Sequence, residues 1–161
     1  MAKQNDYRHD GDVCIGTDEG GNEFVIDESS YEIVSPYHWD MLPNGYFISS
    51  SFGKTTLLHR LIMGAHKGYE VDHINHKKFD CRKLNLRICT RYENAKNRPM
   101  QSNNSSGYKG VSWHKKNQLW RARIKSDHKM IELGYYKTPE QAYSKYCDAA
   151  KKYHGEFACE G

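Results

Sequence analysis

The stretch VDHINH (71–76) constrains the fold of this 161-residue chain more than any other part of its sequence. Asp72 and His73 are neighbours there, and a carboxylate beside an imidazole can hold a divalent metal ion close to a proton acceptor. That is the minimum for hydrolysing a phosphodiester. Neighbouring residues on a regular strand point to opposite faces. If both act on one phosphate, the backbone should leave strand geometry at this pair, with His73 on a bend or at the edge of a loop.

Two short strands joined by a long excursion are predicted around this pair. Val71 and Ile74 flank it on the first arm. Asn85 lies on the second arm, and its amide, which can donate and accept at once, is expected to tie the excursion to the His73 arm. The apolar residues that alternate along this second arm are Leu84, Leu86 and Ile88.

A short helix over roughly 91–98 is predicted to follow. Thr90 and Glu93 match a capping box, and Pro99 ends the segment. Asn94 lies in the second turn, and the positive N-terminal end of the helix favours a phosphate nearby. The order strand, excursion, strand, helix should therefore bring Asn94 close to the pair. The basic residues on about the same face as Asn94 are Arg91 and Arg98.

One further histidine, His59, lies among leucines in TTLLHRLIM (55–63). The segment is predicted to be a buried strand or a short helix. A hydrogen-bonded core histidine is the favoured interpretation, and a role in a site is the alternative.

The first 53 residues are predicted to be an acidic, β-rich region. The opening twelve are polar and expected to fray. Asn44-Gly45 predicts a hairpin with a type I′ turn, and 27–35 predicts a short helix. No chemistry is predicted for this region, which is expected to buttress the rest of the chain. The first two segments predicted to be strands are VCIG (13–16) and EFVI (23–26).

The C-terminal third is predicted to hold three strands and one long helix. Residues 99–107 (PMQSNNSSG) are small and polar, as in a flexible linker. The helix is capped by Thr138, begins at Pro139 and ends near Gly155. The three strand-like runs are YKGVSW (108–113), LWRARIK (119–125) and MIELGYY (130–136).

Alternation along the middle run predicts one apolar and one basic face of this sheet. Trp120, Ala122 and Ile124 should face the helix. The opposite face is of a size that can enter a DNA major groove, and solvated charge without a partner is the alternative. Its basic residues are Arg121, Arg123 and Lys125, with Lys109 and Lys115 adding to them.

The net charge of +4 is unevenly divided along the chain. Residues 1–53 carry −8, residues 54–90 carry +5 and residues 91–161 carry +7. A polyanion would be drawn to the C-terminal two-thirds. The longest apolar run, LLHRLIM (57–63), contains a histidine and an arginine, which excludes a membrane span. No apolar signal opens the chain, so it is expected in the cytoplasm. Its five cysteines are scattered, which predicts reduced thiols and neither disulfides nor structural zinc.

Five fragments occur in order along residues 59–94: HRLI, VDHIN, D-x-R, NLR and T-x-x-x-N. Asn85 follows His73 by twelve residues, and Asn94 follows Asn85 by nine. Together they resemble the HNH nucleases of phages and mobile introns, whose core is a metal-binding fold of two strands and one helix.

The resemblance implies a role for each matching residue. His73 would be the general base that activates a water molecule, and Asn85 would orient the loop. Asp72 and Asn94 would bind one divalent cation, Mg²⁺ or Mn²⁺. Two residues depart from the usual pattern: Cys81 stands where asparagine is frequent, and His76 stands where glycine is common. Histidine tolerates positive φ, and His76 as a second base is an alternative.

The C-terminal third resembles the ethylene-response-factor type of plant DNA-binding domain. The matching fragments are YKGV (108–111), W-x-A-x-I (120–124), LGYY (133–136) and AYSKYCDAA (142–150). Such domains read bases from the outer face of the sheet. The resemblance implies as DNA contacts Lys109, Ser112, Lys115, Arg121, Arg123 and Lys125.

Together these observations predict an α+β chain with an acidic N-terminal region (1–53), a nuclease core (54–98), a linker (99–107) and a DNA-binding domain (108–158). The expected function is metal-dependent cleavage of double-stranded DNA, as in homing or phage enzymes. A non-catalytic DNA-binding regulator is the alternative. An RNA-binding protein is less favoured, because Trp113 and Trp120 are expected in the core. The oligomeric state is left open between a monomer and a weak homodimer.

Overall fold

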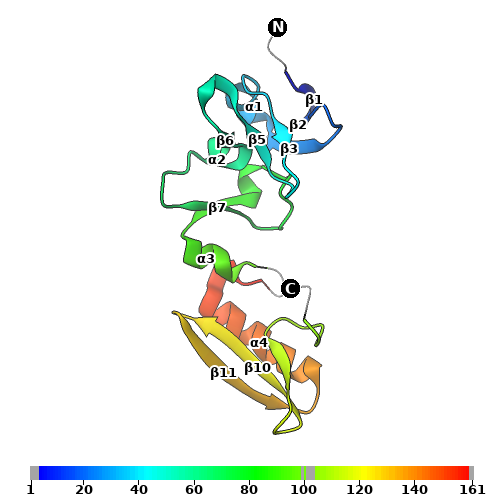
Figure 1. Ribbon diagram of the computed structural model, residues 1–161, viewed down its shortest axis with the longest axis vertical. Coiled ribbons are helices and arrows are strands. Elements are labelled where there is room, and N and C mark those ends of the chain that lie inside the picture. The colour runs from blue at the N-terminus through cyan, green and yellow to red at the C-terminus, as the bar shows by residue number, and fades with distance from the viewer. Residues whose placement is uncertain (1–3, 99, 101–103, 160–161) are drawn as a thin grey trace. The chain divides into compact units, whose positions relative to one another are not determined.

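The computed structural model describes residues 4–98, 100 and 104–159 (Figure 1). The chain divides into two compact units, Met1–Arg91 and Tyr92–Gly161. Both combine helices with antiparallel strands, which confirms the predicted α+β class. Within the described residues no helix is long and apolar enough to cross a membrane. The predicted linker lies partly outside this description, at residues 99 and 101–103.

The first unit begins with a three-stranded antiparallel sheet in the order β1-β2-β3. For residues 4–12 the expectation of a frayed N-terminus is wrong: the side chain of Asn5 accepts from Trp39 N at 2.7 Å and donates to Trp39 O at 2.8 Å. These bonds hold the entry to β1 against the core. Residues 1–3 lie outside the description. The elements are β1 (Asp6–Asp10), β2 (Val13–Thr17), β3 (Glu23–Asp27), the 3-10 helix η1 (Glu28–Ser30) and α1 (Tyr31–Val34).

A second small sheet, in the order β4-β5-β6, contains the predicted hairpin. Its turn is not type I′, because only Gly45 (φ +84°) has positive φ among its central residues. Proline at position 43 sets a negative φ at the first corner, which a type I′ turn forbids. The elements are β4 (Asp40–Met41), β5 (Phe47–Ser49), η2 (Ser51–Gly53), β6 (Thr56–Leu57) and α2 (Leu58–Met63).

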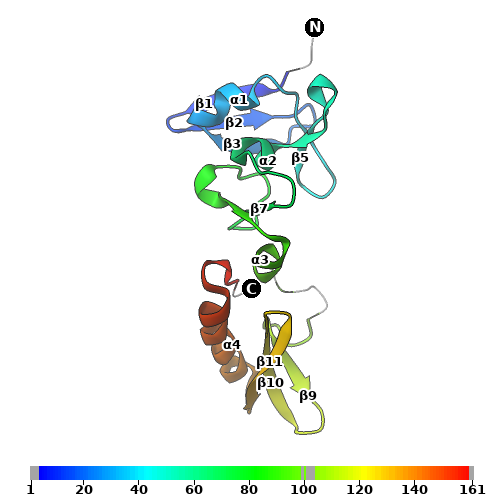
Figure 2. The ribbon, with the colours of Figure 1, turned by 90° about the vertical axis from the view of Figure 1, so that its left-hand side faces the viewer.

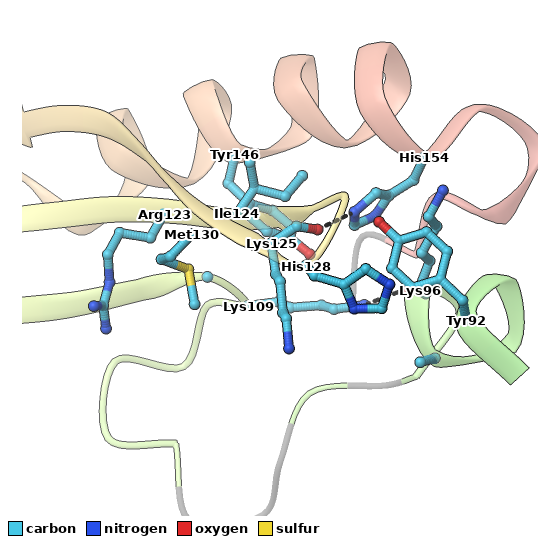
Figure 3. Close-up of a pocket in the computed structure, with 12 residues that line it drawn as sticks. Tyr92, Lys96, Lys109, Arg123, Ile124, Lys125, His128, Met130, Tyr146 and His154 are labelled. Atoms are coloured by element: carbon cyan, nitrogen blue, oxygen red, sulfur yellow. Dashed lines mark hydrogen bonds between the residues drawn. The ribbon is translucent and has the colours of Figure 1, made fainter.

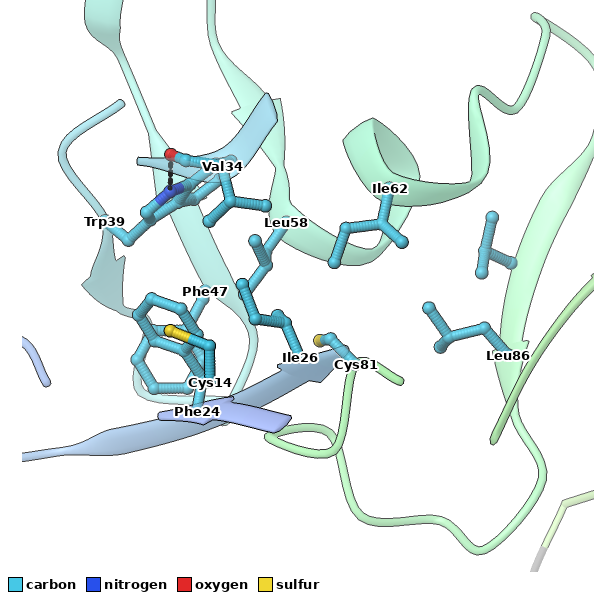
Figure 4. Close-up of a cluster of buried hydrophobic side chains, with 11 residues drawn as sticks. Cys14, Phe24, Ile26, Val34, Trp39, Phe47, Leu58, Ile62, Cys81 and Leu86 are labelled. Carbon is cyan, nitrogen blue, oxygen red and sulfur yellow. Dashed lines mark hydrogen bonds between the residues drawn. The ribbon is translucent and has the colours of Figure 1, made fainter. Parts of the chain in front are cut away.

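The last part of the first unit is an antiparallel pair of strands. These are β7 (Glu70–His73) and β8 (Leu86–Cys89), with η3 (Lys83–Asn85) before the second. One hydrophobic core joins this pair to α2 and to the N-terminal sheet (Figure 4). Trp39, Phe24 and Leu58 are fully buried in it, and Leu86 reaches it from β8. The acidic N-terminal region and the strands carrying the Asp-His pair therefore fold around the same core.

The second unit is the predicted three-stranded sheet packed on one helix (Figures 1 and 2). Ala122 and Ile124 face α4, where Ala142, Tyr146 and Ala150 are buried. Thr138 Oγ1 accepts from Gln141 N at 3.3 Å, as the predicted cap requires. The elements are α3 (Arg91–Lys96), which begins one residue before this unit, then β9 (Val111–His114), β10 (Leu119–Ser126), β11 (Lys129–Tyr136), α4 (Pro139–His154) and η4 (Gly155–Phe157).

The expectation that both tryptophans lie in this core is wrong for Trp113. Its ring contacts that of Trp120, its cross-strand partner, at 5.2 Å. Trp113 is nevertheless 42% exposed, because it lies near the end of β9. RNA binding was less favoured because both tryptophans were expected in the core, and Trp113 no longer supports that argument.

Candidate active site and DNA-binding face

Strand β7 carries the Asp-His pair in unbroken antiparallel register. Asp72 faces Arg87, and His73 faces Leu86. The predicted break in strand geometry at this pair is therefore wrong, because the ladder with β8 continues through both residues. Only the second half of that expectation holds: His73 is the last residue of the strand and borders the loop. Asp72 and His73 consequently have different neighbours.

Asp72 is held by a buried ion pair with Arg87. The guanidinium Nε and Nη2 donate to Oδ2 of Asp72 at 2.9 Å and 2.6 Å. The two side chains are only 9% and 11% exposed. Strand pairing creates this contact, since the two residues are directly opposite. Alternation along β8 places position 87 on the face opposite Leu86, but the sequence does not determine the register that brings Arg87 to Asp72.

His73 is packed between aromatic rings and a thiol. Its ring centroid lies 5.0 Å from that of His59 and 5.9 Å from that of Tyr46. Its Nε2 lies 3.8 Å from Cys81 Sγ. Burial lowers the pKa of His73 to about 4, although the Asp72 charge opposes the shift. The imidazole is therefore neutral at pH 7, the form that can accept a proton.

His59 is both a buried residue and a neighbour of the site. It lies on α2, is 5% exposed and packs against His73 and Tyr46. Burial, together with the nearby His73 and Arg60, lowers its pKa to about 3. The buried position expected of a core histidine is confirmed, although its ring makes no hydrogen bond among the described residues. A role of His59 in a site stays a prediction.

Because both pKa values lie below the ordinary 6.5, acid should destabilise the first unit. Between pH 6.5 and about 4 the unfolded chain binds more protons at these histidines than the folded chain does. The free energy of unfolding should fall by up to about 1.4 kcal/mol per pH unit for each histidine. Urea denaturation at several pH values measures this slope. His59→Leu should make it shallower, whereas the exposed-site control His66→Gln should not; equal slopes in all three proteins would contradict the assignment.

The side-chain amide of Asn85 accepts one hydrogen bond and donates another, as expected. Its Oδ1 accepts from Asn75 N at 3.0 Å, and its Nδ2 donates to Asp80 O at 2.7 Å. Ile74 N donates to Asn85 O at 2.9 Å. The loop that leaves β7 is thereby tied to the residue before β8. His76, in the same loop, has φ +63°, as expected at a position where glycine is common.

The N-terminal sheet holds the far side of this loop. Val25 N donates to Phe79 O, and Cys81 N donates to Val25 O, both at 2.8 Å. Asp27 Oδ2 accepts from Lys83 N at 2.7 Å. These bonds provide the buttress that was expected of the acidic region.

A hard divalent cation fits the donors proposed for it. Asp72 offers a carboxylate oxygen and Asn94 an amide oxygen, the ligand types that Mg²⁺ and Mn²⁺ prefer. The structure brings together Asp72, His73 and Asn85 in the first unit. Asn94 lies on α3, and its participation stays a prediction.

Helix α3 is anchored to the turn between β10 and β11. Asp127 N donates to the hydroxyl of Tyr92, whose ring centroid lies 4.8 Å from that of His128. Asp127 and His128 have φ of +48° and +63°, the backbone of a type I′ turn without glycine. Contacts with Tyr92 stabilise this uncommon turn. The helix that bears Asn94 is thus fixed to the sheet of the second unit.

The outer face of that sheet carries the predicted basic row. Arg121 lies opposite Ser112 and Tyr135, and Arg123 lies opposite Glu132. The residues of the row that are exposed or half-exposed are Ser112, Lys115, Arg121, Arg123 and Lys125. Arg91 and Arg98 are exposed as well. The alternation predicted for β10 is confirmed, while contact with DNA stays a prediction.

Lys109 departs from this group because its ammonium is engaged within the protein. Nζ donates to the carbonyl oxygens of Lys96 at 3.4 Å and Cys159 at 3.0 Å, and to that of Arg98. An ammonium has three protons to donate, so these bonds occupy all of them. The structure gives Lys109 a structural role in place of the expected outward one.

A pocket of about 290 Å³ lies beside Lys109 within the second unit (Figure 3). Arg123 and Met130 lie at one end, and Tyr92 and His128 lie at the other. No acidic residue lines it among those that the structure describes. The charged residues that line it are all basic: Lys96, Lys109, Arg123 and Lys125.

Comparison with known families matches both parts of the chain. Residues 56–96 match the family described as HNH endonuclease, and residues 106–156 match the AP2 domain. The first match contains β7, β8 and α3, and the second contains the sheet and α4. No solved structure matches the chain.

Two viral proteins are similar in sequence. An uncharacterized HNH endonuclease of Acanthamoeba polyphaga mimivirus is 32% identical over 151 residues, which are 91% of this chain and 78% of that protein. Protein 3.8 of Escherichia phage T7 is 36% identical over 63 residues, 39% of this chain and 52% of that protein. The first similarity extends through nearly the whole chain.

Proposed function

The chain belongs to the HNH endonuclease family, and we propose that it is a metal-dependent endonuclease whose AP2 domain directs it to DNA. The observation that carries this proposal is the buried, neutral His73 at the end of β7, beside Asp72 and a loop tied by Asn85. The match of residues 56–96 to the HNH family supports it. Homing or phage-type cleavage is the biological setting that the resemblance favours.

In this proposal His73 accepts the proton of the attacking water. Its neutral imidazole is ready to do so at pH 7, while the hydrogen bonds of Asn85 hold the neighbouring loop. Asp72 and Asn94 would hold one divalent cation, which when bound neutralises charge that develops on the phosphate and the 3′ leaving oxygen. Attack and departure occur in line, on opposite sides of phosphorus. Because Asp72 and His73 are consecutive on a regular strand, their side chains point to opposite faces, and they can act on one phosphate only if it lies at the end of β7.

One observation favours the alternative of a DNA-binding regulator without catalysis. Arg87 already donates two hydrogen bonds to Oδ2 of Asp72, so a cation has to share or displace this partner. Incubation with supercoiled plasmid and Mg²⁺, with and without chelator, separates the two functions. Nicking that the chelator stops supports the nuclease. Specific DNA binding without nicking in Mg²⁺ or Mn²⁺ supports the regulator.

Each chain has one proposed catalytic centre. A monomer would therefore nick one strand, and cutting both strands would require a dimer or a second event.

Binding to DNA should depend strongly on salt. If about five basic side chains meet phosphates, the slope of log affinity against log salt should be about −4 to −5. Arg121→Gln and Arg123→Gln should each reduce its magnitude by about 1. Fluorescence anisotropy at several salt concentrations measures the slope. Lys145→Gln, on α4 and 56% exposed, is the control and should leave it unchanged; equal effects of all three substitutions would argue against the sheet face.

A further inference from the structure

A cluster of three possible metal ligands lies in the N-terminal sheet, the region without assigned chemistry. His9 on β1 lies directly opposite Cys14 on β2, so both side chains share one face of the sheet. Glu28 begins η1, and its backbone N donates to Asp12 O at 2.9 Å, which brings it to the β1–β2 hairpin. One ligand atom from each of the three residues lies within 4.8 Å of the other two.

Two of the three side chains are open to solvent, and the third lies in the core. His9 Nδ1 lies 2.9 Å from both carboxylate oxygens of Glu28, and these two side chains are 47% and 42% exposed. Cys14 is fully buried, and its thiol has no hydrogen bond among the described residues. The Tyr31 ring packs edge-on against His9, with centroids 4.8 Å apart. An ion could therefore enter from solvent and meet a thiol held from the core side.

Although the scattered cysteines predict no structural zinc, we propose that His9, Cys14 and Glu28 form a site for a transition-metal ion of the Zn²⁺ class. Zinc takes imidazole nitrogen, thiolate sulfur and carboxylate oxygen together, with bonds of about 2.0–2.3 Å. In a tetrahedron those bonds separate ligand atoms by about 3.5 Å, so the widest pair must close by about 1 Å. Rotation of the exposed His9 and Glu28 side chains can supply that movement. Water would fill the fourth position.

The donor set distinguishes this ion from the one proposed for DNA cleavage. Thiolate and imidazole select against Mg²⁺, which prefers oxygen ligands. Binding displaces the proton of the Cys14 thiol and leaves a thiolate on the metal. The bound ion would tie the β1–β2 hairpin to η1, and so stabilise the sheet that holds the catalytic loop.

Titration of the full-length protein with Co²⁺ tests the site, because a thiolate ligand gives an intense sulfur-to-cobalt absorption band. One equivalent should produce the band, and Zn²⁺ should then abolish it. Cys14→Ser should lose it, and His9→Ala and Glu28→Gln, at exposed side chains, should weaken Co²⁺ binding by at least about tenfold. Cys81→Ser and His66→Ala are the matched controls and should retain both band and affinity.

Two results would overturn the proposal. Absence of the band in the wild-type protein would mean that the cluster is only a His9–Glu28 ion pair beside a buried thiol. If the absorption band survives in Cys14→Ser, or disappears in Cys81→Ser, the metal is bound by another cysteine. The nuclease function does not enter this test, because its proposed ligands include no thiolate.

Discussion

His73→Ala should lower the rate of DNA cleavage by about 10²–10⁴-fold, because the variant loses the group that accepts the proton of the attacking water. DNA binding should be retained, because the basic residues expected to contact DNA are unchanged. Plasmid nicking and fluorescence anisotropy, measured on the same preparation, separate the two effects. Circular dichroism checks that the emptied site has not unfolded the protein.

His76→Asn is the matched control for that substitution. His76 lies three residues further on and was the alternative base. Asparagine accepts its positive φ of +63°, so the loop should keep its shape. Cleavage should continue in His76→Asn. If His73→Ala cleaves DNA as fast as the wild-type protein, His73 is not the base. The same conclusion follows if only His76→Asn loses cleavage.

Arg87→Leu should destabilise the first unit by about 3–5 kcal/mol, because it leaves the Asp72 carboxylate buried without its guanidinium partner. Chemical denaturation followed by tryptophan fluorescence measures the loss, since Trp39 lies in the core of the same unit. Cleavage should also suffer, because Asp72 would no longer be held in place.

The source of that loss can be identified with a second substitution. If the loss of the guanidinium beside the buried carboxylate is the cause, Asp72→Asn in the Arg87→Leu background should recover part of the stability. Lys145→Ala removes an exposed ion pair and should change stability by less than about 1 kcal/mol. If the double variant is no more stable than Arg87→Leu alone, the loss of stability comes from packing and not from the buried charge.

Local sequence patterns predicted most of the elements correctly. Alternation in LWRARIK placed Ala122 and Ile124 on the helix, and the Thr138 cap marked the start of α4. Asn85 was expected to connect two backbone segments because an amide can both accept and donate a hydrogen bond, and the structure contains both bonds. These predictions succeed because they depend on residues close together in the sequence.

Contacts between distant segments were harder to predict. The Asp72–Arg87 ion pair depends on strand register, which a loop of this length does not fix. Strand β1 was missed because its sequence, DYRHD, is polar, and it is held by tertiary contacts such as those of Asn5 with Trp39. Lys109 was assigned to the outer face, whereas three carbonyl oxygens from two distant segments bind it.

The unbroken strand at Asp72 and His73 changes how the site is understood. Asp72 bonds to Arg87, whereas His73 packs against His59 and Tyr46 and lies near Cys81. Catalysis by both therefore requires the phosphate to lie at the end of β7. Helix α3, which bears Asn94, is fixed to the AP2 sheet through Tyr92.

A cleavage map on a pool of DNA sequences tests the central claim most directly. The protein is incubated with the pool and Mg²⁺, with a chelator arm and a His73→Ala arm, and all new ends are sequenced. We predict ends with a 3′-hydroxyl that recur at related sequences in the Mg²⁺ arm and are absent from the other two. Selective binding of the pool without new ends in Mg²⁺ or Mn²⁺ would contradict the account and identify the chain as a regulator.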